Sequence, residues 1–151
     1  MSNSDRFTIV NDTITQLNEG FDPFTIPDGI TSISDNAFNS CAGITSIIIP
    51  IILVLSPSDI RQDLNNYTSI VSVISIGMYA FFSCTGLTSI IIPTSVTSID
   101  RGAFVNCTGL TSLIIPSGVT SIGDEAFSNF TGLTSVIILA SVTSIGNSLF
   151  Q

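Results

Sequence analysis

Short runs of apolar and polar residues recur along the chain in a fixed order. The run Leu87-Thr-Ser-Ile-Ile-Ile-Pro93 has apolar residues at positions one, four and six, and it recurs as Leu110–Pro116 and, upstream, as Ile44–Pro50. Its β-branched residues and single apolar face predict a short strand. The proline ends the strand because it lacks the amide hydrogen that a ladder needs. We therefore expect strands at about 45–49, 68–72, 88–92, 111–115 and 134–138.

A second short phrase follows each run. Val96-Thr-Ser-Ile99 returns as Val119–Ile122 and predicts a further extended segment with its first and last residues buried. An aromatic residue lies eight positions after the start of each phrase: Phe38, Phe81, Phe104, Phe127 and Phe150. The residues around each aromatic predict a short helix or 3-10 turn. We expect a positive φ at the glycines that follow this turn, namely Gly43, Gly86, Gly109 and Gly132.

Both phrases recur with a period of 23 residues, and this period indicates the fold class. One unit of this size cannot bury its apolar edge, so successive units must stack. The sequence predicts a β-rich repeat solenoid, a right-handed superhelix with a parallel concave sheet and short helical or 3-10 turns on the convex side. Residues 1–20 match no repeat and are expected to form an N-terminal cap segment. Residues 21–151 are expected to form about six repeats, of which the second, about 51–73, is degenerate and the least regular.

The complete repeat, Leu-x-x-Ile-x-Ile-Pro-x-x-Val-x-x-Ile-Gly-x-x-Ala-Phe-x-x-Cys-x-Gly, resembles the BspA-like leucine-rich repeat family over about residues 21 to 150. The chain departs from the pattern at Leu139, which occupies the proline position, and in the second repeat, which lacks the phenylalanine. The resemblance implies a curved leucine-rich-repeat solenoid of the kind found in bacterial and protist surface proteins that bind host or matrix proteins. It implies a surface antigen with a role in adhesion, and it implies no catalytic residues.

The charge balance excludes several kinds of chemistry. The 151 residues include 3 Lys+Arg, all of them arginine, 11 Asp+Glu and no His, for a net charge of −8. Without imidazole or lysine there is no Ser-His or Cys-His nucleophile pair, no Schiff base and no His-ligated zinc. Nucleic acid is not an expected partner, because its binding requires several cations on one face. Asp124 and Glu125 are adjacent but do not form paired carboxylates across a pocket, so we predict no enzyme, no cofactor and no metal site.

The chain shows no segment that would direct or anchor it to a membrane. The first twenty residues lack the apolar core of a signal peptide. The longest apolar stretch, Ile44–Leu55, is interrupted by Pro50 and is too short to cross a bilayer. We expect no membrane insertion, and the family resemblance suggests a cell-surface or secreted location if the chain is part of a longer protein. No polar cap follows Phe150 and Gln151, which leaves end-to-end stacking as one possible route to self-association.

The three cysteines occupy one position of the repeat, which Phe130 fills in a later repeat. Counting repeats places Cys41 and Cys84 two turns apart, beyond the reach of a disulfide, whereas Cys84 and Cys107 lie on neighbouring turns. Because phenylalanine replaces cysteine at this position, we interpret all three as free thiols that pack as small hydrophobic groups.

The outward positions of the first strand carry no charge and combine hydroxyl groups with isoleucine. Exposed apolar rows tend to mark contact surfaces, although Thr, Ser and Ile are also simply good strand residues. We predict a non-catalytic protein-binding or adhesive scaffold that contacts a protein partner, or a second copy, through this concave face. The alternative is a binder of an ordered non-protein surface such as polysaccharide or ice, which a flat sheet with threonine rows in register would favour. The candidate residues are Thr45, Ser46, Ile48, Thr88, Ser89, Ile91, Thr111, Ser112, Ile114, Thr134, Ser135 and Ile137, with Thr68, Ser69 and Val71 in the second repeat.

Overall fold

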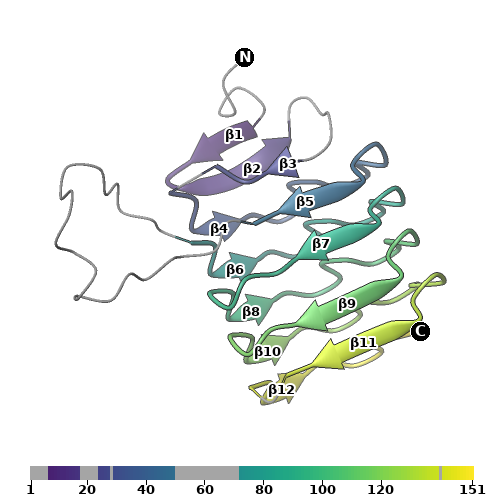
Figure 1. Ribbon diagram of the computed structural model, residues 1–151. Coiled ribbons are helices and arrows are strands. Elements are labelled where there is room, and N and C mark those ends of the chain that lie inside the picture. The colour runs from purple at the N-terminus through teal and green to yellow at the C-terminus, as the bar shows by residue number, and fades with distance from the viewer. Residues whose placement is uncertain (1–6, 18–23, 28, 50–71, 140) are drawn as a thin grey trace, which may run out of the picture.

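The chain folds into a stack of turns in which strands alternate between two ladders (Figure 1). The computed structural model describes residues 7–17, 24–27, 29–49, 72–139 and 141–151. The first ladder contains β3 (Phe24–Thr25), β5 (Ser46–Ile48), β7 (Ser89–Ile91), β9 (Ser112–Ile115) and β11 (Ser135–Ile138). The second ladder contains β1 (Phe7–Val10), β2 (Thr13–Leu17), β4 (Ser32–Ile33), β6 (Ser75–Ile76), β8 (Ser98–Ile99), β10 (Ser121–Ile122) and β12 (Ser144–Ile145).

The strand pairing follows the sequence repeat. Ser98 pairs with Ser121, and Ile114 pairs with Ile137, in parallel ladders that match equivalent residues of successive repeats. Strands β5, β7, β9 and β11 lie within the predicted segments 45–49, 88–92, 111–115 and 134–138. The predicted parallel-sheet solenoid is therefore confirmed. The predicted strand at 68–72 falls almost entirely outside the described residues.

An antiparallel hairpin begins the stack. β1 and β2 are joined by Asn11 and Asp12, whose φ angles of 48° and 58° suit a two-residue turn that matches the twist of a hairpin. β2 then pairs in parallel with β4, and Ile14 lies beside Ile33. Residues 13–17 therefore extend the second ladder as one of its strands.

The core consists of columns of equivalent apolar residues between the two ladders. The rings of Phe38, Phe81, Phe104 and Phe127 stack in series with centroid separations of 4.8, 5.0 and 5.8 Å. Phe104 and Phe127 are fully buried, as the repeat pattern predicted. Each ring covers the ring of the preceding turn, so a turn completes its core only when the next turn is present.

The segment around each phenylalanine is a run of turns, and no helix forms among the described residues. The Ala80 amide donates within its own turn to the Gly77 carbonyl at 3.3 Å, but the next amide, that of Phe81, donates to Ala103 on the following turn at 2.7 Å. This alternation repeats along the segment. Every second amide is therefore committed to a neighbouring turn, so of the predicted short helix or 3-10 turn only isolated 3-10-type hydrogen bonds form, and no helix does.

The glycines that follow these turns do not have the predicted positive φ. Among the described glycines, only Gly29 and Gly102 have one. Gly109 is required for space, because a Cβ on it would lie 2.7 Å from the Leu87 carbonyl oxygen of the preceding turn. The prediction of a positive φ at Gly43, Gly86, Gly109 and Gly132 is thus wrong, and close packing against the backbone of the preceding turn explains glycine at Gly86, Gly109 and Gly132.

The strands on either side of residues 50–71 are direct neighbours. β4 pairs with β6, and β5 pairs with β7. The predicted degenerate repeat at about 51–73 falls largely on residues 50–71, outside the described part of the chain. Cys41 and Cys84 consequently lie on neighbouring turns, and the prediction that two turns separate them is wrong, because it counted a repeat between β5 and β7.

Candidate interaction surface

The first ladder brings the predicted contact residues onto one surface, which we call the Thr/Ser/Ile face. They lie on or immediately before β5, β7, β9 and β11. The face consists of Thr45, Ser46, Ile48, Thr88, Ser89, Ile91, Thr111, Ser112, Ile114, Thr134, Ser135 and Ile137. The corresponding residues of the second repeat, Thr68, Ser69 and Val71, lie outside the described residues.

The isoleucines of this face form an exposed row. The exposed fractions of Ile48, Ile91, Ile114 and Ile137 are 39%, 55%, 57% and 49%. Successive side chains of a strand point to opposite faces, so the preceding residues Ile47 and Leu113 are buried in the core. The ladder register places Ile48 beside Ile91 and Ile114 beside Ile137. The pairing is interrupted between β7 and β9, and the concave curvature of this face stays a prediction.

The threonine hydroxyls on this face hydrogen-bond to the backbone. Thr88 Oγ1 donates to the Thr45 carbonyl oxygen at 3.0 Å, and Thr134 Oγ1 donates to Thr111 at 2.9 Å. A hydroxyl has one hydrogen to donate, so toward a ligand these two groups act as acceptors. The second ladder carries its own threonine row, in which Thr120 Oγ1 donates to Thr97 at 3.2 Å. The threonines are thus divided between two ladders.

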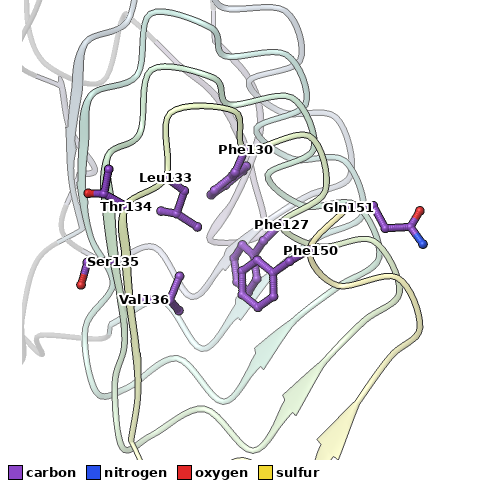
Figure 2. A pocket seen from close by; sticks show the side chains of 8 residues that line it. All are labelled: Phe127, Phe130, Leu133, Thr134, Ser135, Val136, Phe150 and Gln151. Carbon is purple, nitrogen blue, oxygen red and sulfur yellow. The ribbon is translucent and has the colours of Figure 1, made fainter.

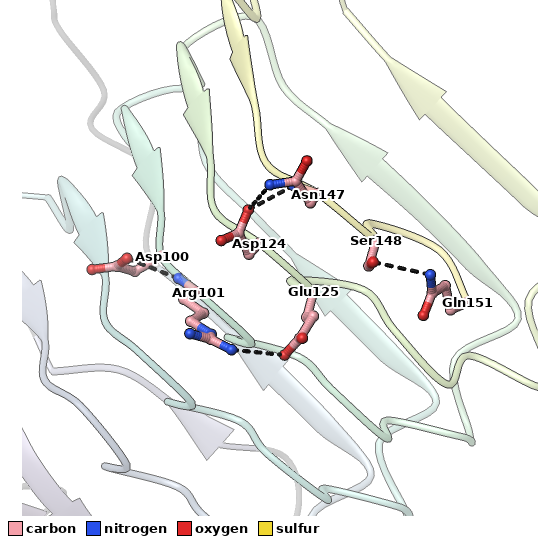
Figure 3. A network of polar contacts seen from close by, with 7 residues as sticks. All are labelled: Asp100, Arg101, Asp124, Glu125, Asn147, Ser148 and Gln151. Carbon is pink, nitrogen blue, oxygen red and sulfur yellow. Dashed lines mark hydrogen bonds and ion pairs between the residues drawn. The ribbon is translucent and has the colours of Figure 1, made fainter.

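The Thr/Ser/Ile face contains no charged residue, and the charged residues of the last turns lie beyond the second ladder (Figure 3). Asp124 Oδ1 accepts a hydrogen bond from the Asn147 backbone amide at 2.6 Å. Glu125 instead forms an exposed ion pair with Arg101 at 3.5 Å. The two acidic side chains therefore have different partners, and such exposed ion pairs contribute little to stability.

A shallow groove of about 380 Å³ along the second ladder was not predicted. Its lining includes Ser32, Ser75 and Ser98, and the Ser32 and Ser75 hydroxyl oxygens are 3.0 Å apart. Asp35 also lines it, and the Asp35 carboxylate accepts a hydrogen bond from the Met78 backbone amide at 2.8 Å. The sequence signal for this groove was the serine at the third position of the second phrase in each repeat. Within the described ranges, no three His, Cys, Asp or Glu side chains gather as a metal site would require.

The three cysteines are free thiols inside the stack. Cys84 donates to the Phe38 carbonyl and Cys107 donates to the Phe81 carbonyl, both at 3.0 Å. Burial raises the pKa of Cys41 to about 11. Interaction with the neighbouring Cys84 thiol, together with burial, raises the pKa of Cys107, and the same interaction lowers the pKa of Cys84. Protonated thiols are weak nucleophiles and poor metal ligands, which fits the predicted packing role of Cys41 and Cys107, and Cys84 is fully buried.

Comparison with known proteins connects this architecture to one repeat family. The BspA type leucine-rich repeat region matches residues 8–57 and 60–151, in six copies. No match to a curated protein sequence was found. In the part of the chain that the structure describes, no helix is long and apolar enough to span a bilayer.

Solved structures share the fold over nearly the whole chain. A leucine-rich repeat protein from T. pallidum has a TM-score of 0.77 and 23% identity, over 95% of this chain and 63% of that one. A leucine-rich repeat protein from Bacteroides capillosus has a TM-score of 0.65 and 24% identity, over 89% of this chain and 93% of that one. A leucine-rich cell surface protein from Faecalibacterium prausnitzii has a TM-score of 0.57 and 26% identity, over 94% of this chain and 43% of that one. The chain thus spans less than two thirds of the T. pallidum and F. prausnitzii proteins.

Proposed function

Since this chain belongs to the BspA-type leucine-rich repeat family, and so is a repeat scaffold, we propose that it is a non-catalytic protein-binding scaffold. The proposed contact surface is the Thr/Ser/Ile face. The observation that carries the proposal is its row of isoleucines, which are 39–57% exposed and have no charged neighbour on the face. On a chain with a net charge of −8, an uncharged apolar row of this extent is typical of a contact surface.

The scaffold presents this row in a fixed geometry. The ladder register aligns the isoleucines, and the core residues Ile47 and Leu113 hold the opposite side of the same strands. A partner would therefore meet side chains that are already ordered, which lowers the entropic cost of binding. The hydroxyl oxygens beside the isoleucines accept hydrogen bonds, so the fitting partner is a protein surface with an apolar strip and flanking amide or hydroxyl donors.

A cell-surface location and an adhesive role form part of the proposal. They are supported by the similarity to the F. prausnitzii protein, which is described as a leucine-rich cell surface protein. A binding scaffold displayed in this way needs no cofactor. Its partners would be proteins outside the cell or a second copy of the chain.

The alternative, recognition of polysaccharide or ice by threonine ladders, has less support. Such recognition would use evenly spaced hydroxyl groups on one flat face. Here Thr88 and Thr134 donate their hydrogens to the backbone, and another threonine row lies on the second ladder. These observations favour a protein partner.

Replacement of Ile91 and Ile114 by Asp tests the proposal. Both side chains point away from the core, so folding should persist while binding is lost. Immobilised fibronectin, laminin and collagen serve as protein probes, and cellulose pull-down and ice recrystallisation test the alternative. Ile74→Asp is the matched control, because Ile74 is 49% exposed but lies just before β6 on the second ladder. Equal protein binding by the wild type and the double variant would contradict the proposal, as would binding confined to cellulose or ice.

A further inference from the structure

We propose that Cys84 and Cys107 form a disulfide between adjacent turns of the solenoid when hydrogen peroxide oxidises the chain, and that Cys41 remains a free thiol. This proposal concerns the core of the stack and does not depend on the Thr/Ser/Ile face. It rests on the alignment of the two cysteines, on the interaction between their thiols and on the different orientation of Cys41.

Cys84 and Cys107 lie on turns whose backbones are hydrogen-bonded to each other. The Phe81 amide donates to the Ala103 carbonyl oxygen at 2.7 Å. The rings of Phe81 and Phe104, which precede the two cysteines in their turns, stack at a centroid separation of 5.0 Å. Equivalent residues of neighbouring turns are about 4.8 Å apart in a parallel ladder, and a disulfide requires Cα atoms about 4.4 to 6.8 Å apart. The two cysteines are therefore within reach of each other.

Both cysteine side chains point into the stack and lean toward the preceding turn. Cys84 and Cys107 are completely buried. The Cys107 sulfur lies 3.0 Å from the carbonyl oxygen of Phe81, which belongs to the turn of Cys84. Phe130, which fills the cysteine position in the following turn, points inward and packs against the ring of Phe127 (Figure 2). The Cys107 sulfur thus already lies against the turn that carries Cys84.

Cys41 has a different orientation from the other two cysteines. Its thiol donates to the Asn39 carbonyl oxygen of its own turn at 3.8 Å, whereas the Cys84 and Cys107 thiols donate to carbonyl oxygens of the preceding turn. The Cys41 side chain is also only partly buried. A disulfide with Cys84 would require Cys41 to leave its acceptor and turn inward, so we expect Cys41 to stay reduced.

The pair provides both a nucleophile and a second thiol that completes the disulfide. Interaction with the Cys107 thiol lowers the pKa of Cys84, because Cys107 can turn its one hydrogen toward the Cys84 sulfur when that sulfur is ionised. The thiolate is the nucleophilic form of cysteine. We therefore expect Cys84 to react first. Because both thiols are buried, peroxide reaches them only when neighbouring turns separate briefly, and the reaction is slower than that of an exposed thiol.

The oxidation proceeds in two steps. The Cys84 sulfur attacks one oxygen of hydrogen peroxide, the O–O bond breaks, and the departing hydroxide takes up the thiol proton to form water. Cys84 is then a sulfenic acid, which condenses with a nearby thiol. The Cys107 sulfur attacks the Cys84 sulfur, the S–O bond breaks, and the departing hydroxide takes up the Cys107 proton. Two thiols are oxidised to one disulfide, and one peroxide is reduced to two molecules of water.

Thiol counting and peptide mapping of the native 151-residue chain test the proposal. After overnight exposure to millimolar hydrogen peroxide at neutral pH, the chain should lose two hydrogen atoms in mass. Maleimide labelling in urea should then find one free thiol, at Cys41. Cleavage after Arg61 and Arg101 places the three cysteines on different tryptic peptides, so mass spectrometry should recover the peptides of Cys84 and Cys107 as one linked species. Dithiothreitol should restore all three thiols.

Cys41→Ala is the matched control and should still form the cross-link, whereas Cys107→Ala should form none. Circular dichroism establishes that both variants fold. The mapping of the unsubstituted chain decides by itself if a variant does not fold. Three free thiols after the exposure, a cross-link that includes Cys41 or joins two chains, or sulfinic acid in place of the disulfide would overturn the proposal.

Discussion

The phenylalanine at the centre of each turn is the residue on which packing depends most. Phe104 is fully buried between Phe81 and Phe127, so Phe104→Ala should cost about 3–5 kcal/mol of unfolding free energy, through lost contacts and a residual cavity. Phe150→Ala should cost less, because Phe150 already has 45% of its surface exposed. Urea denaturation of the two variants measures the difference. Equal losses would show that the stack does not distribute its stability as the burial indicates.

The buried thiols predict a loss of stability at alkaline pH. In the unfolded chain cysteine ionises near pH ~8.5, whereas the folded chain raises the pKa of Cys41 to about 11 and also raises that of Cys107. The Cys107 thiol lowers the pKa of Cys84, so Cys84 contributes with the opposite sign, and Cys41 and Cys107 are the two groups that lose stabilisation as the pH rises. The stabilising contribution is complete below the unfolded pKa. It decreases as pH rises above that value, because the unfolded state then releases protons that the folded state retains.

The unfolding free energy, measured by urea denaturation between pH 7 and about pH 10.5, tests whether stability decreases as the pH rises. Cys107→Ala should lower stability at neutral pH and also flatten the alkaline decline, since one retained proton is removed. Tyrosine also titrates at high pH, so the comparison uses the slope of the variant against the slope of the wild type. Parallel slopes would mean that Cys107 ionises equally in both states.

Within the turns, glycine provides the space that adjacent backbones need. A Cβ on Gly109 would lie 2.7 Å from the Leu87 carbonyl oxygen and 2.8 Å from that of Thr85, while a Cβ on Gly43 would meet no atom within 4 Å in the part of the chain that the structure describes. Gly109→Ala should therefore cost about 1–3 kcal/mol through forced backbone shifts. Gly43→Ala should be neutral or stabilise by up to about 1 kcal/mol, because alanine restricts the unfolded chain. Thermal unfolding of the Gly109→Ala and Gly43→Ala variants measures the difference. A similar loss of stability in both variants would reject the explanation by backbone spacing.

The strands of the first ladder were predictable from the sequence because each is encoded locally, by its apolar positions and, except at Leu139, by a terminal proline. The turns were not, because the Phe81 amide donates to Ala103, a partner on the following turn. A helix prediction for that segment considers only hydrogen bonds within it. The glycine prediction failed for the same reason, since the obstacle to a side chain on Gly109 belongs to the preceding turn.

Counting repeats along the sequence also led to a wrong prediction of which turns lie next to each other in the stack. It assumed that each 23-residue segment adds one turn to the stack, whereas β5 pairs directly with β7 and so brings Cys41 next to Cys84. The Thr/Ser/Ile face was predictable because side-chain alternation fixes which strand residues point outward. The groove lined by Ser32, Ser75 and Ser98 was missed, because a recurring serine in a short phrase does not show that its neighbours leave a hollow.

At the scale of the whole molecule, a stack in which each turn contacts only its neighbours should open from its less covered end. The Phe81 and Phe104 amides donate between inner turns, at 2.7 and 2.9 Å, whereas the Asn129 amide donates to Gln151 on the last turn at 2.7 Å. The bond lengths are similar, so any difference in protection reflects the position of the turn. Loss of the final interface exposes Asn129 first, because fewer contacts must break.

Native-state hydrogen exchange should therefore be slow at Phe81 and Phe104 and faster at Asn129. A variant with one further repeat added after Gln151 provides the control, since its Asn129 amide should exchange as slowly as the Phe104 amide. Uniform protection along the unmodified 151-residue chain would show that the solenoid unfolds as one cooperative unit.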